Sequence, residues 1–475
     1  MNRTPSLALL LGVALLPCVA SANDALAPAL TRQMEVNRQR YGIAGQALLV
    51  THDGKVLFRG ADGEADTSTH TRLDADAVFA GYSLSKLFVS TLVMQLVEQG
   101  QLDLQAPIGT YVAGLPVRWR SIAVRDFLDH TSGVPEYFDN RSGEAAASVA
   151  ALPADREAAF ASLTNAPLLF EPGTDIRYTQ TNYLVLTALL EAHYGQPYAQ
   201  VAGERIIRKL HLRHTWLGPA AIPARGVVTS YVGRHGRLQK EQDLAWPRYA
   251  YGHASLYITL DDLGRFLQAM SSGELVDKAT LRRLWQPRIL AGDRRGWFAS
   301  GWEYGESGAY RQVGHDGGAR VRVRMLFRDT PDADVYVFAY LTNGSASNVW
   351  SRTLVDSAMA TVAPERFPME ALSETLMRYA TQIPSAIDAR TQAHAIRAST
   401  QIDDAALERA IDTAGNGIRE NLGLERALRV FALNTVLFPR SANAWDSLAE
   451  AYAAKGEPHK AKRLHAKARL LSRQP

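Results

Sequence analysis

Apolar and polar residues alternate near both ends of the first three quarters of the chain, a pattern typical of β-strands. Residues 45–60 (GQALLVTHDGKVLFRG) contain two such runs around Asp53-Gly54, a pair that favours a tight hairpin turn. The pattern returns at residues 320–327 (RVRVRMLF) and 334–343 (DVYVFAYLTN). We therefore expect a hairpin early in the chain and two further strands much later.

Between these strands the pattern is mostly helical. Residues 83–98 are apolar nearly all round, which predicts a helix buried on most sides. Residues 183–195 form a second apolar helix ending at Gly195, and residues 258–270 form a third with Thr259 as its cap. The order of elements predicts an α+β fold, with an antiparallel sheet from both chain ends flanked by helices, and a helical insertion lobe.

After Pro364 the strand signals stop, and residues 366–475 are expected to be all-helical. One stretch, NAWDSLAEAYAAKGEPHKAKRLHAKARLL, resembles a tetratricopeptide unit, with matching residues at Trp445, Leu448, Tyr452, Gly456, Ala461 and Ala468. A helix over about 424–437 precedes it. Because a lone repeat cannot bury its own apolar face, we expect it to pack on the main body or on a protein partner.

The first 22 residues have the pattern of a secretory signal. Arg3 precedes an apolar run, LALLLGVALL, and Ala20-Ser21-Ala22 offers a cleavage site. This divides the chain into a signal peptide (1–22), a main domain (23–365) and a helical C-terminal segment (366–475), and predicts a secreted or periplasmic protein.

The single cysteine, Cys18, lies within this leader, so the mature chain is expected to have neither disulfides nor thiolate chemistry. Acylation of Cys18 is a weaker alternative, because Pro17 stands where a lipoprotein has a small residue. No other segment has the pattern of a membrane span.

The composition, 47% hydrophobic and 21% charged, is that of a folded globular protein. The formal net charge of +4 is concentrated in residues 455–475, which leaves the rest of the mature chain slightly acidic and argues against nucleic-acid binding. Lys460, Arg463 and Lys467 share a face of the last predicted helix. That face is either simply solvated or a contact for anionic lipid or an acidic partner.

The motif GYSLSKLF places Ser83 three residues before Lys86 at the start of the first long helix. The two side chains would share one helix face, where a desolvated lysine could take a proton from the serine. The simpler interpretation is a serine helix cap. Lys86, however, interrupts an otherwise apolar helix, and a charge in such a place needs a partner or a task.

Two further segments carry candidate chemistry. Tyr178, in RYTQTNY, would be a usable base if a lysine ammonium stabilised its phenolate, although a packed aromatic is the simpler interpretation. In GHDGGARVRV, His315 is followed by Gly317 and Gly318, where backbone can approach a substrate. The amides of Ser83 and Gly318 would make an oxyanion hole, the alternative being a β-bulge beside a surface histidine.

Together these motifs resemble the serine β-lactamase-like family of class C β-lactamases, D-alanyl carboxypeptidases and related esterases. Three other stretches are also similar to that family: RDFLDHTSGVPEY, EPGTDIRYTQTNY and ASLYITLDDLGRFLQAM. The resemblance covers about residues 35–362. It implies a serine hydrolase acting through an acyl-enzyme, without a cofactor, on a small-molecule or peptide substrate.

The resemblance also implies a role for each site residue: Ser83 as nucleophile, Lys86 in proton transfer, Tyr178 as general base, His315 in the place of a lysine, and the Ser83 and Gly318 amides as oxyanion donors. Gln180 stands where the family has asparagine, and Asn182 matches a second, structural asparagine. Gln180 and His315 weaken a true β-lactamase and favour an esterase or peptidase. Esters, D-amino-acid peptides and lactams all remain open as substrates, as does the oligomeric state.

Other functions fit the sequence less well. GYSLS nearly matches the G-x-S-x-G elbow of α/β-hydrolases, but lacks its last glycine and the preceding parallel strands. A cell-wall or peptide sensor with a weakened site is the main alternative, which the retained Ser83, Lys86 and Tyr178 argue against. Metal-binding motifs are absent from the sequence. Arg320 or His315 is a candidate to receive a substrate carboxylate.

Overall fold

The computed structural model describes residues 22–138, 152–219, 222, 226–241, 246–330, 333–382 and 388–473. The expected signal peptide lies outside the described residues except for its last position, Ala22, where a helix begins. The leader therefore stays a prediction.

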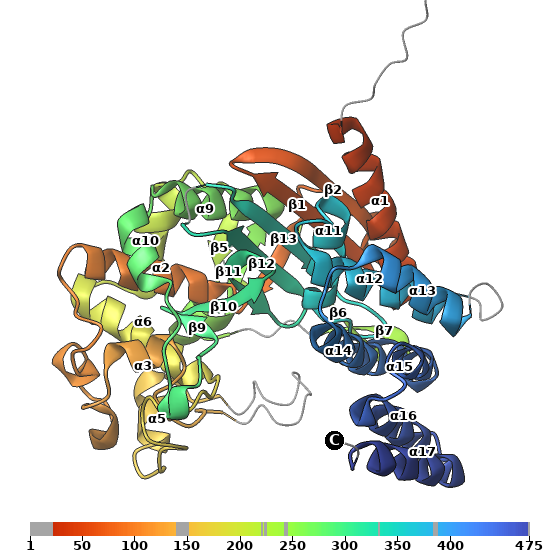
Figure 1. The fold of residues 1–475 in the computed structure, drawn as a ribbon. Helices are drawn as coiled ribbons and strands as arrows, with labels where there is room; N and C mark the ends of the chain where they lie inside the picture. The colour runs from red at the N-terminus through yellow and green to blue at the C-terminus, as the bar shows by residue number, and fades with distance from the viewer. Residues whose placement is uncertain are drawn as a thin grey trace, which may run out of the picture.

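The centre of the molecule is an antiparallel sheet of eight strands in the order β3-β2-β1-β13-β12-β11-β10-β9 (Figure 1). β1 pairs with β2 as the expected hairpin and on its other side with β13, so the two ends of the main domain share one sheet. The strands are β1 (Gly45–His52), β2 (Lys55–Asp66), β3 (Thr71–Arg72), β9 (Phe298–Ala299), β10 (Trp302–Ser307), β11 (Tyr310–Gly317), β12 (Val321–Phe327) and β13 (Tyr336–Thr342). The predicted α+β fold is confirmed.

The lobe side of the sheet carries the larger core, named here the inner core. Ala47 and Leu49 of β1 face it together with Val323 of β12, and the apolar helix α2 lies within it. The helices of this lobe are α2 (Ser85–Glu98), α3 (Val124–Leu128), α5 (Arg156–Ser162), α6 (Gln180–Tyr194), α7 (Tyr198–Ala202), α8 (Tyr251–Ala254), α9 (Leu260–Ser272) and α10 (Lys278–Leu284). α6 ends at Gly195 and α9 is capped by the Thr259 side chain, both as expected.

Small sheets and short turns complete the lobe. β4 (Val78–Tyr82), β8 (Leu256–Thr259) and β5 (Thr215–Leu217) form one sheet, and β6 (Tyr231–Arg234) and β7 (Arg237–Lys240) form another. 3₁₀ turns occur at Ile108–Thr110, Val117–Trp119, Arg248–Ala250 and Ala291–Asp293, with a π-helical segment at Gly203–Arg208. β4 matters most for function, because it leads directly into α2.

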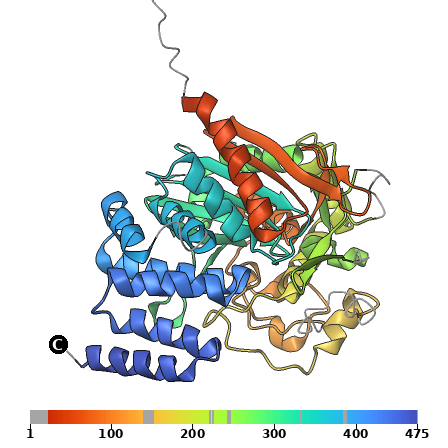
Figure 2. The same ribbon diagram turned by 90° about the vertical axis from the view of Figure 1, so that its right-hand side faces the viewer.

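The opposite face of the sheet carries an outer core, to which Leu48 and Val50 of β1 contribute. Alternate residues of one strand thus serve the two cores, as the period of a β-strand requires. α1 (Ala22–Tyr41) and α11 (Ser351–Val362) lie across this face (Figure 2). α1 was not anticipated from the sequence.

The C-terminal segment continues the outer core rather than standing apart from it. Its helices are α12 (Pro368–Thr381), α13 (Ala389–Ser399), α14 (Asp404–Leu422), α15 (Leu424–Leu437), α16 (Ala442–Ala454) and α17 (Pro458–Leu471). Leu376 of α12 belongs to the same apolar cluster as Phe338 of the sheet. A buried ion pair between Arg40 of α1 and Glu374 of α12, at 2.9 Å, joins the same two parts.

α15 occupies the residues expected for the helix before the repeat-like stretch. α16 and α17 pack together, with the Lys460 ammonium 3.6 Å from the Tyr452 ring centre and that of Lys467 3.3 Å from the Trp445 ring centre. Two of the three basic residues of the expected charged face are therefore engaged with aromatic rings. The tetratricopeptide likeness and the domain boundary at residue 365 stay predictions.

Among the helices of the described residues, none combines the length and apolarity needed to cross a membrane.

The shared outer core predicts that the C-terminal helices and the catalytic body unfold together. Leu376 is fully buried, so Leu376→Ala should lower the free energy of unfolding by about 2–5 kcal/mol. Thermal melts followed by far-UV circular dichroism and by residual activity should show one coincident transition. Leu470→Ala, at a position 63% exposed, is the control and should change stability by no more than about 0.5 kcal/mol. Melting of the helices well below the loss of activity would contradict this coupling.

Candidate active site

Ser83 lies on the turn between β4 and α2, just before the helix. β4 ends at Tyr82, which has a left-handed backbone with a φ of 47°. α2 begins at Ser85 rather than at Ser83. The Ser85 hydroxyl donates to the Tyr82 carbonyl at 2.7 Å and accepts from the Leu256 amide at 2.9 Å. The turn that carries Ser83 is thereby tied to β8.

Lys86 is fully buried on the first turn of α2. Its Nζ lies 3.2 Å from Ser83 Oγ, and it donates to Gln180 Oε1 at 2.7 Å and to the main-chain carbonyl of His253 at 2.8 Å. Burial lowers the pKa of Lys86 well below its usual value, and the charge of Glu136 only partly opposes this. The surroundings therefore favour the neutral amine.

Tyr178 approaches Ser83 from the segment before α6. Its hydroxyl donates to Ser83 Oγ at 2.9 Å, and its ring packs 4.4 Å from the ring of His130. Burial raises the pKa of Tyr178 well above its usual value. Burial disfavours both the phenolate of Tyr178 and the ammonium of Lys86. The expected role of Tyr178 as general base stays a prediction.

Gln180 and Asn182, both on the first turn of α6, have different surroundings. Gln180 reaches Lys86, as described above. Asn182 is buried and contacts Ser132 at 2.6 Å, His130 Nδ1 at 3.0 Å and Thr179 at 2.9 Å. Asn182 thus joins α6 to the loop that follows α3, which fits the structural role expected for it.

β11 brings the third segment to Ser83. His315 is 1% exposed, its Nδ1 lies 2.6 Å from the Asp316 carbonyl, and its ring centre is 6.0 Å from that of Tyr178. Burial lowers the pKa of His315, opposed in part by Glu303. His315 is therefore a buried neighbour of Tyr178 and not a surface histidine.

The glycines at the end of β11 allow close contact with the turn that carries Ser83. A Cβ on Gly317 would lie 2.4 Å from the Gly81 carbonyl oxygen, and one on Gly318 would lie 3.1 Å from the Tyr82 ring. Gly318 also has a φ of +54°, which favours glycine. Within the described part of the chain, the amides of Ser83 and Gly318 donate no hydrogen bond to another residue.

Arg320 lies next to the site, but its charge is already compensated. It forms an ion pair with Glu241, with a second contact at 3.1 Å, and donates to the Tyr82 hydroxyl at 2.7 Å. A substrate carboxylate would have to compete with Glu241 for this guanidinium.

Three contributors to the site were missed in the sequence. His253 acts through a main-chain carbonyl, which no side-chain motif reveals. Tyr137 orients that residue, with its hydroxyl 3.1 Å from His253 Nε2. Glu136 accepts the amide of Gln180 at 2.8 Å. Glu136 and Tyr137 are the last two residues of RDFLDHTSGVPEY, a stretch that resembles the family. Their place in that stretch was the only sign in the sequence that they lie near the site.

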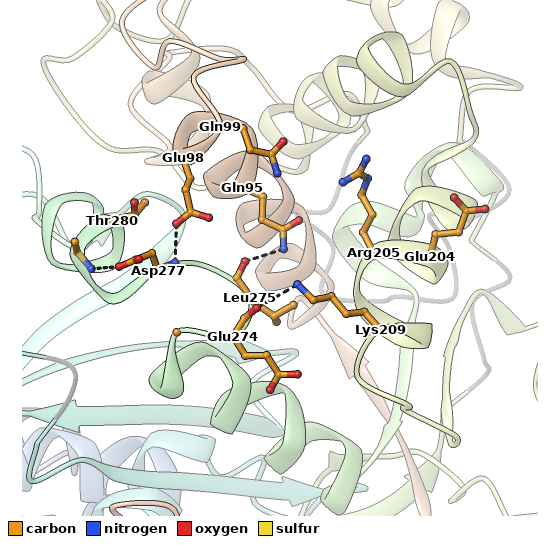
Figure 3. Close-up of a pocket in the computed structure, with 12 residues that line it drawn as sticks. Gln95, Glu98, Gln99, Glu204, Arg205, Lys209, Glu274, Leu275, Asp277 and Thr280 are labelled. Carbon is orange, nitrogen blue, oxygen red and sulfur yellow. Dashed lines mark hydrogen bonds between the residues drawn. The ribbon is translucent and has the colours of Figure 1, made fainter.

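Figure 3 shows a separate polar pocket between the end of α2, the π-helical segment and the loop before α10. Gln95 donates to the Leu275 carbonyl and Lys209 to that of Glu274. Ser83, Lys86 and Tyr178 do not line this pocket. In the described ranges, no group of three or more His, Cys, Asp or Glu side chains is placed to hold a metal ion.

Comparison with known proteins identifies relatives of the main domain. The Beta-lactamase family model matches residues 27–355. Penicillin-binding protein 4 of Amycolatopsis lactamdurans is 27% identical over 70% of this chain and 89% of its own length. The D-alanyl-D-alanine-carboxypeptidase/endopeptidase AmpH of Escherichia coli (strain K12) is 28% identical over 50% of this chain and 60% of its own length.

A solved structure shows the same fold. The octameric penicillin-binding protein homologue from Pyrococcus abyssi superposes with a TM-score of 0.62 at 18% identity, covering 74% of this chain and 81% of that one. The family match spans more than half of the chain and includes Ser83, Lys86, Tyr178 and His315. The chain therefore belongs to the Beta-lactamase family and is an enzyme, a serine hydrolase of that fold.

Proposed function

We propose that the enzyme hydrolyses an ester or a D-amino-acid peptide bond through an acyl-enzyme formed on Ser83. The observation that carries this proposal is that Ser83 Oγ lies within hydrogen-bond distance of both Lys86 Nζ and the Tyr178 hydroxyl, at 3.2 and 2.9 Å. Convergence of a hydroxyl, an amine and a phenol is the arrangement that an activated nucleophile requires.

Lys86, rather than Tyr178, is the base in this proposal. A neutral amine has two N–H groups, which the carbonyl oxygens of Gln180 and His253 accept. Its lone pair is then left for the proton of Ser83. As that proton moves to Lys86, Ser83 Oγ attacks the carbonyl carbon and a tetrahedral intermediate forms.

Tyr178 completes the proton transfer. Its protonated hydroxyl gives its proton to the leaving oxygen or nitrogen as the bond to the acyl carbon breaks, and the Lys86 ammonium returns a proton to Tyr178. The amides of Ser83 and Gly318, which donate to no other residue in the described ranges, are the oxyanion donors. Water, deprotonated in the same way, then releases the acyl group and restores Ser83.

The substrate class rests on the surroundings of the nucleophile. Gln180 and His315 replace the residues expected of a true β-lactamase, which argues against a lactam substrate. Glu241 already neutralises the charge of Arg320, which favours substrates that place no carboxylate beside this guanidinium. AmpH, which acts on D-alanyl-D-alanine bonds by its name, supports a peptide substrate. The leader pattern of residues 1–22 supports a secreted or periplasmic location.

The central test compares wild type, Ser83→Ala and Lys86→Met on nitrocefin, a short-chain nitrophenyl ester and a D-Ala-D-Ala peptide. We expect ester or peptide turnover to exceed nitrocefin turnover, and both variants to lose at least about 10³-fold in kcat with a retained fold, because each removes a group acting in the transition state. A fluorophosphonate should label wild type but not Ser83→Ala. Folded wild type that is neither labelled nor active would favour the alternative of a cell-wall or peptide sensor.

The oxyanion role of Gly318 predicts an effect on acylation that backbone strain alone does not produce. Gly318→Ala should slow labelling of Ser83 by about tenfold or more, because its methyl group would press on the Tyr82 ring and so move the residue 318 amide away from the oxyanion. Gly114→Ala is the matched control, because Gly114 also has a positive φ of 75° but has no atom within 4 Å of an added Cβ. Equal labelling rates for the two variants would exclude this role.

The pairing of Arg320 with Glu241 predicts a change in selectivity. Glu241→Gln should raise kcat/KM for a D-Ala-D-Ala peptide relative to its C-terminal amide by about threefold or more, because the freed guanidinium can bind the carboxylate. The double variant Glu241→Gln/Arg320→Ala should lose this gain. An unchanged ratio in Glu241→Gln would show that Arg320 does not reach the substrate.

A further inference from the structure

We propose that Glu136 is a positioning residue of the acyl-transfer site: its carboxylate holds the amino end of α6 and places a negative charge beside the contact between Gln180 and Lys86. This inference rests on the proposed function of Ser83 and Lys86. Glu136 makes no direct contact with Ser83, so it acts through the residues that do.

Glu136 caps α6 from a different segment of the chain. Its Oε2 accepts the Gln180 amide at 2.8 Å, and its Oε1 accepts the Thr181 hydroxyl at 3.3 Å and the Tyr137 amide at 3.1 Å. The Ncap residue of α6, Thr179, caps no amide with its own side chain. A carboxylate at this end is favourable both as a cap and towards the helix dipole.

This cap acts on the two residues that meet the nucleophile and its base. Gln180 is the first residue of α6. Its main-chain amide donates to Glu136, and its side-chain oxygen accepts a hydrogen bond from Lys86 Nζ. Tyr178 lies two residues before it and contacts Ser83. Displacement of the α6 terminus would therefore move both contacts together.

All three hydrogen bonds to Glu136 come from N–H or O–H donors, which the ionised carboxylate satisfies as a pure acceptor. Burial raises the pKa of Glu136, and the bond from Gln180 opposes that rise. The donors thus favour the charged form in a site that otherwise disfavours charge.

The other ionisable groups around Lys86 leave Glu136 as its main electrostatic partner. Burial keeps the histidines neutral by lowering their pKa and keeps the tyrosines protonated by raising theirs, while Glu303 is paired with Arg324. Among described residues, Lys86 has no carboxylate within 4.0 Å, and Glu136 alone opposes its desolvation. The titratable groups around the amine are His130, Tyr178, Tyr183, His253 and His315.

The sign of the effect follows from the role of Lys86 as a neutral base. Activity falls as the pH drops through the pKa of Lys86, and the negative charge of Glu136 raises that pKa. Glu136→Gln removes the charge but keeps the size and a carbonyl oxygen. The pH at which kcat/KM falls to half of its maximum on the acidic side should therefore be lower in Glu136→Gln than in wild type.

Two variants separate charge from capping. Glu136→Asp keeps the charge but shortens the side chain, so its acidic limb should match wild type while kcat falls because the Gln180 amide loses its acceptor. Thr181→Val removes one hydrogen bond and leaves the charge, and its limb should also be unchanged. If Glu136 has a merely structural role, these variants lose activity, but the acidic side of the pH profile of kcat/KM in Glu136→Gln stays where it is in wild type.

The measurement is the pH dependence of kcat/KM for the nitrophenyl ester and of the fluorophosphonate labelling rate. If Glu136→Gln is active and its pH profile of kcat/KM coincides with that of wild type on the acidic side, the inference is overturned. The proposed function of Ser83 is not affected by that result. If Glu136→Gln does not fold, Glu136→Asp tests the positioning role: a wild-type pH profile with reduced kcat supports it, and an unchanged kcat or a shifted pH profile overturns it. Retained activity in Ser83→Ala would instead refute the proposed function itself.

Discussion

The enclosure of one amine in an apolar helix is the constraint on which the site depends. Lys86 is fully buried in α2, where an ammonium would lose most of its hydration. Burial therefore favours the neutral form, and two carbonyl oxygens, of Gln180 and His253, satisfy its N–H groups. The direction left to the lone pair is that of Ser83. The amino end of α6 and the segment at α8 must be in place for this arrangement to exist.

The sheet and its neighbouring turn explain why the three segments meet. β4 delivers Ser83 to the start of α2, while the end of β11 lies against the same turn. Glycines at 317 and 318 make this approach possible, since a side chain at 317 would collide with the Gly81 carbonyl and one at 318 would press on the Tyr82 ring. The site therefore depends on backbone proximity as much as on its reactive side chains.

The opposite face of the sheet links the catalytic body to the C-terminal helices. Strand residues alternate between the inner and outer cores, so a change in one layer acts on the strands that border the other. The ion pair between Arg40 and Glu374 reinforces the same connection. The C-terminal helices extend the outer core through α12, which packs on α11, while α1 and α11 lie on the sheet face itself.

Much of the architecture was predictable because local periodicity and capping agree with the final fold. The hairpin at 45–60, the helix at 83–98 and the strand at 320–327 all have a clear pattern, and the Ser-x-x-Lys motif marked Ser83 and Lys86. α1 was missed, and β9 and β10 were missed because they are short and partly polar. The expected phenolate at Tyr178 stays a prediction, and the motif does not report the burial that raises the pKa of this phenol.

The sequence by itself determined which reactive groups this protein possesses and which helices and strands carry most of them. Only the tertiary structure decided which of these groups touch. It also decided that the main-chain carbonyl of His253 and the carboxylate of Glu136 join them, and that Arg320 forms an ion pair with Glu241. The physical reason is that motifs report local spacing, whereas protonation and pairing follow from desolvation and from contacts between residues up to hundreds of positions apart.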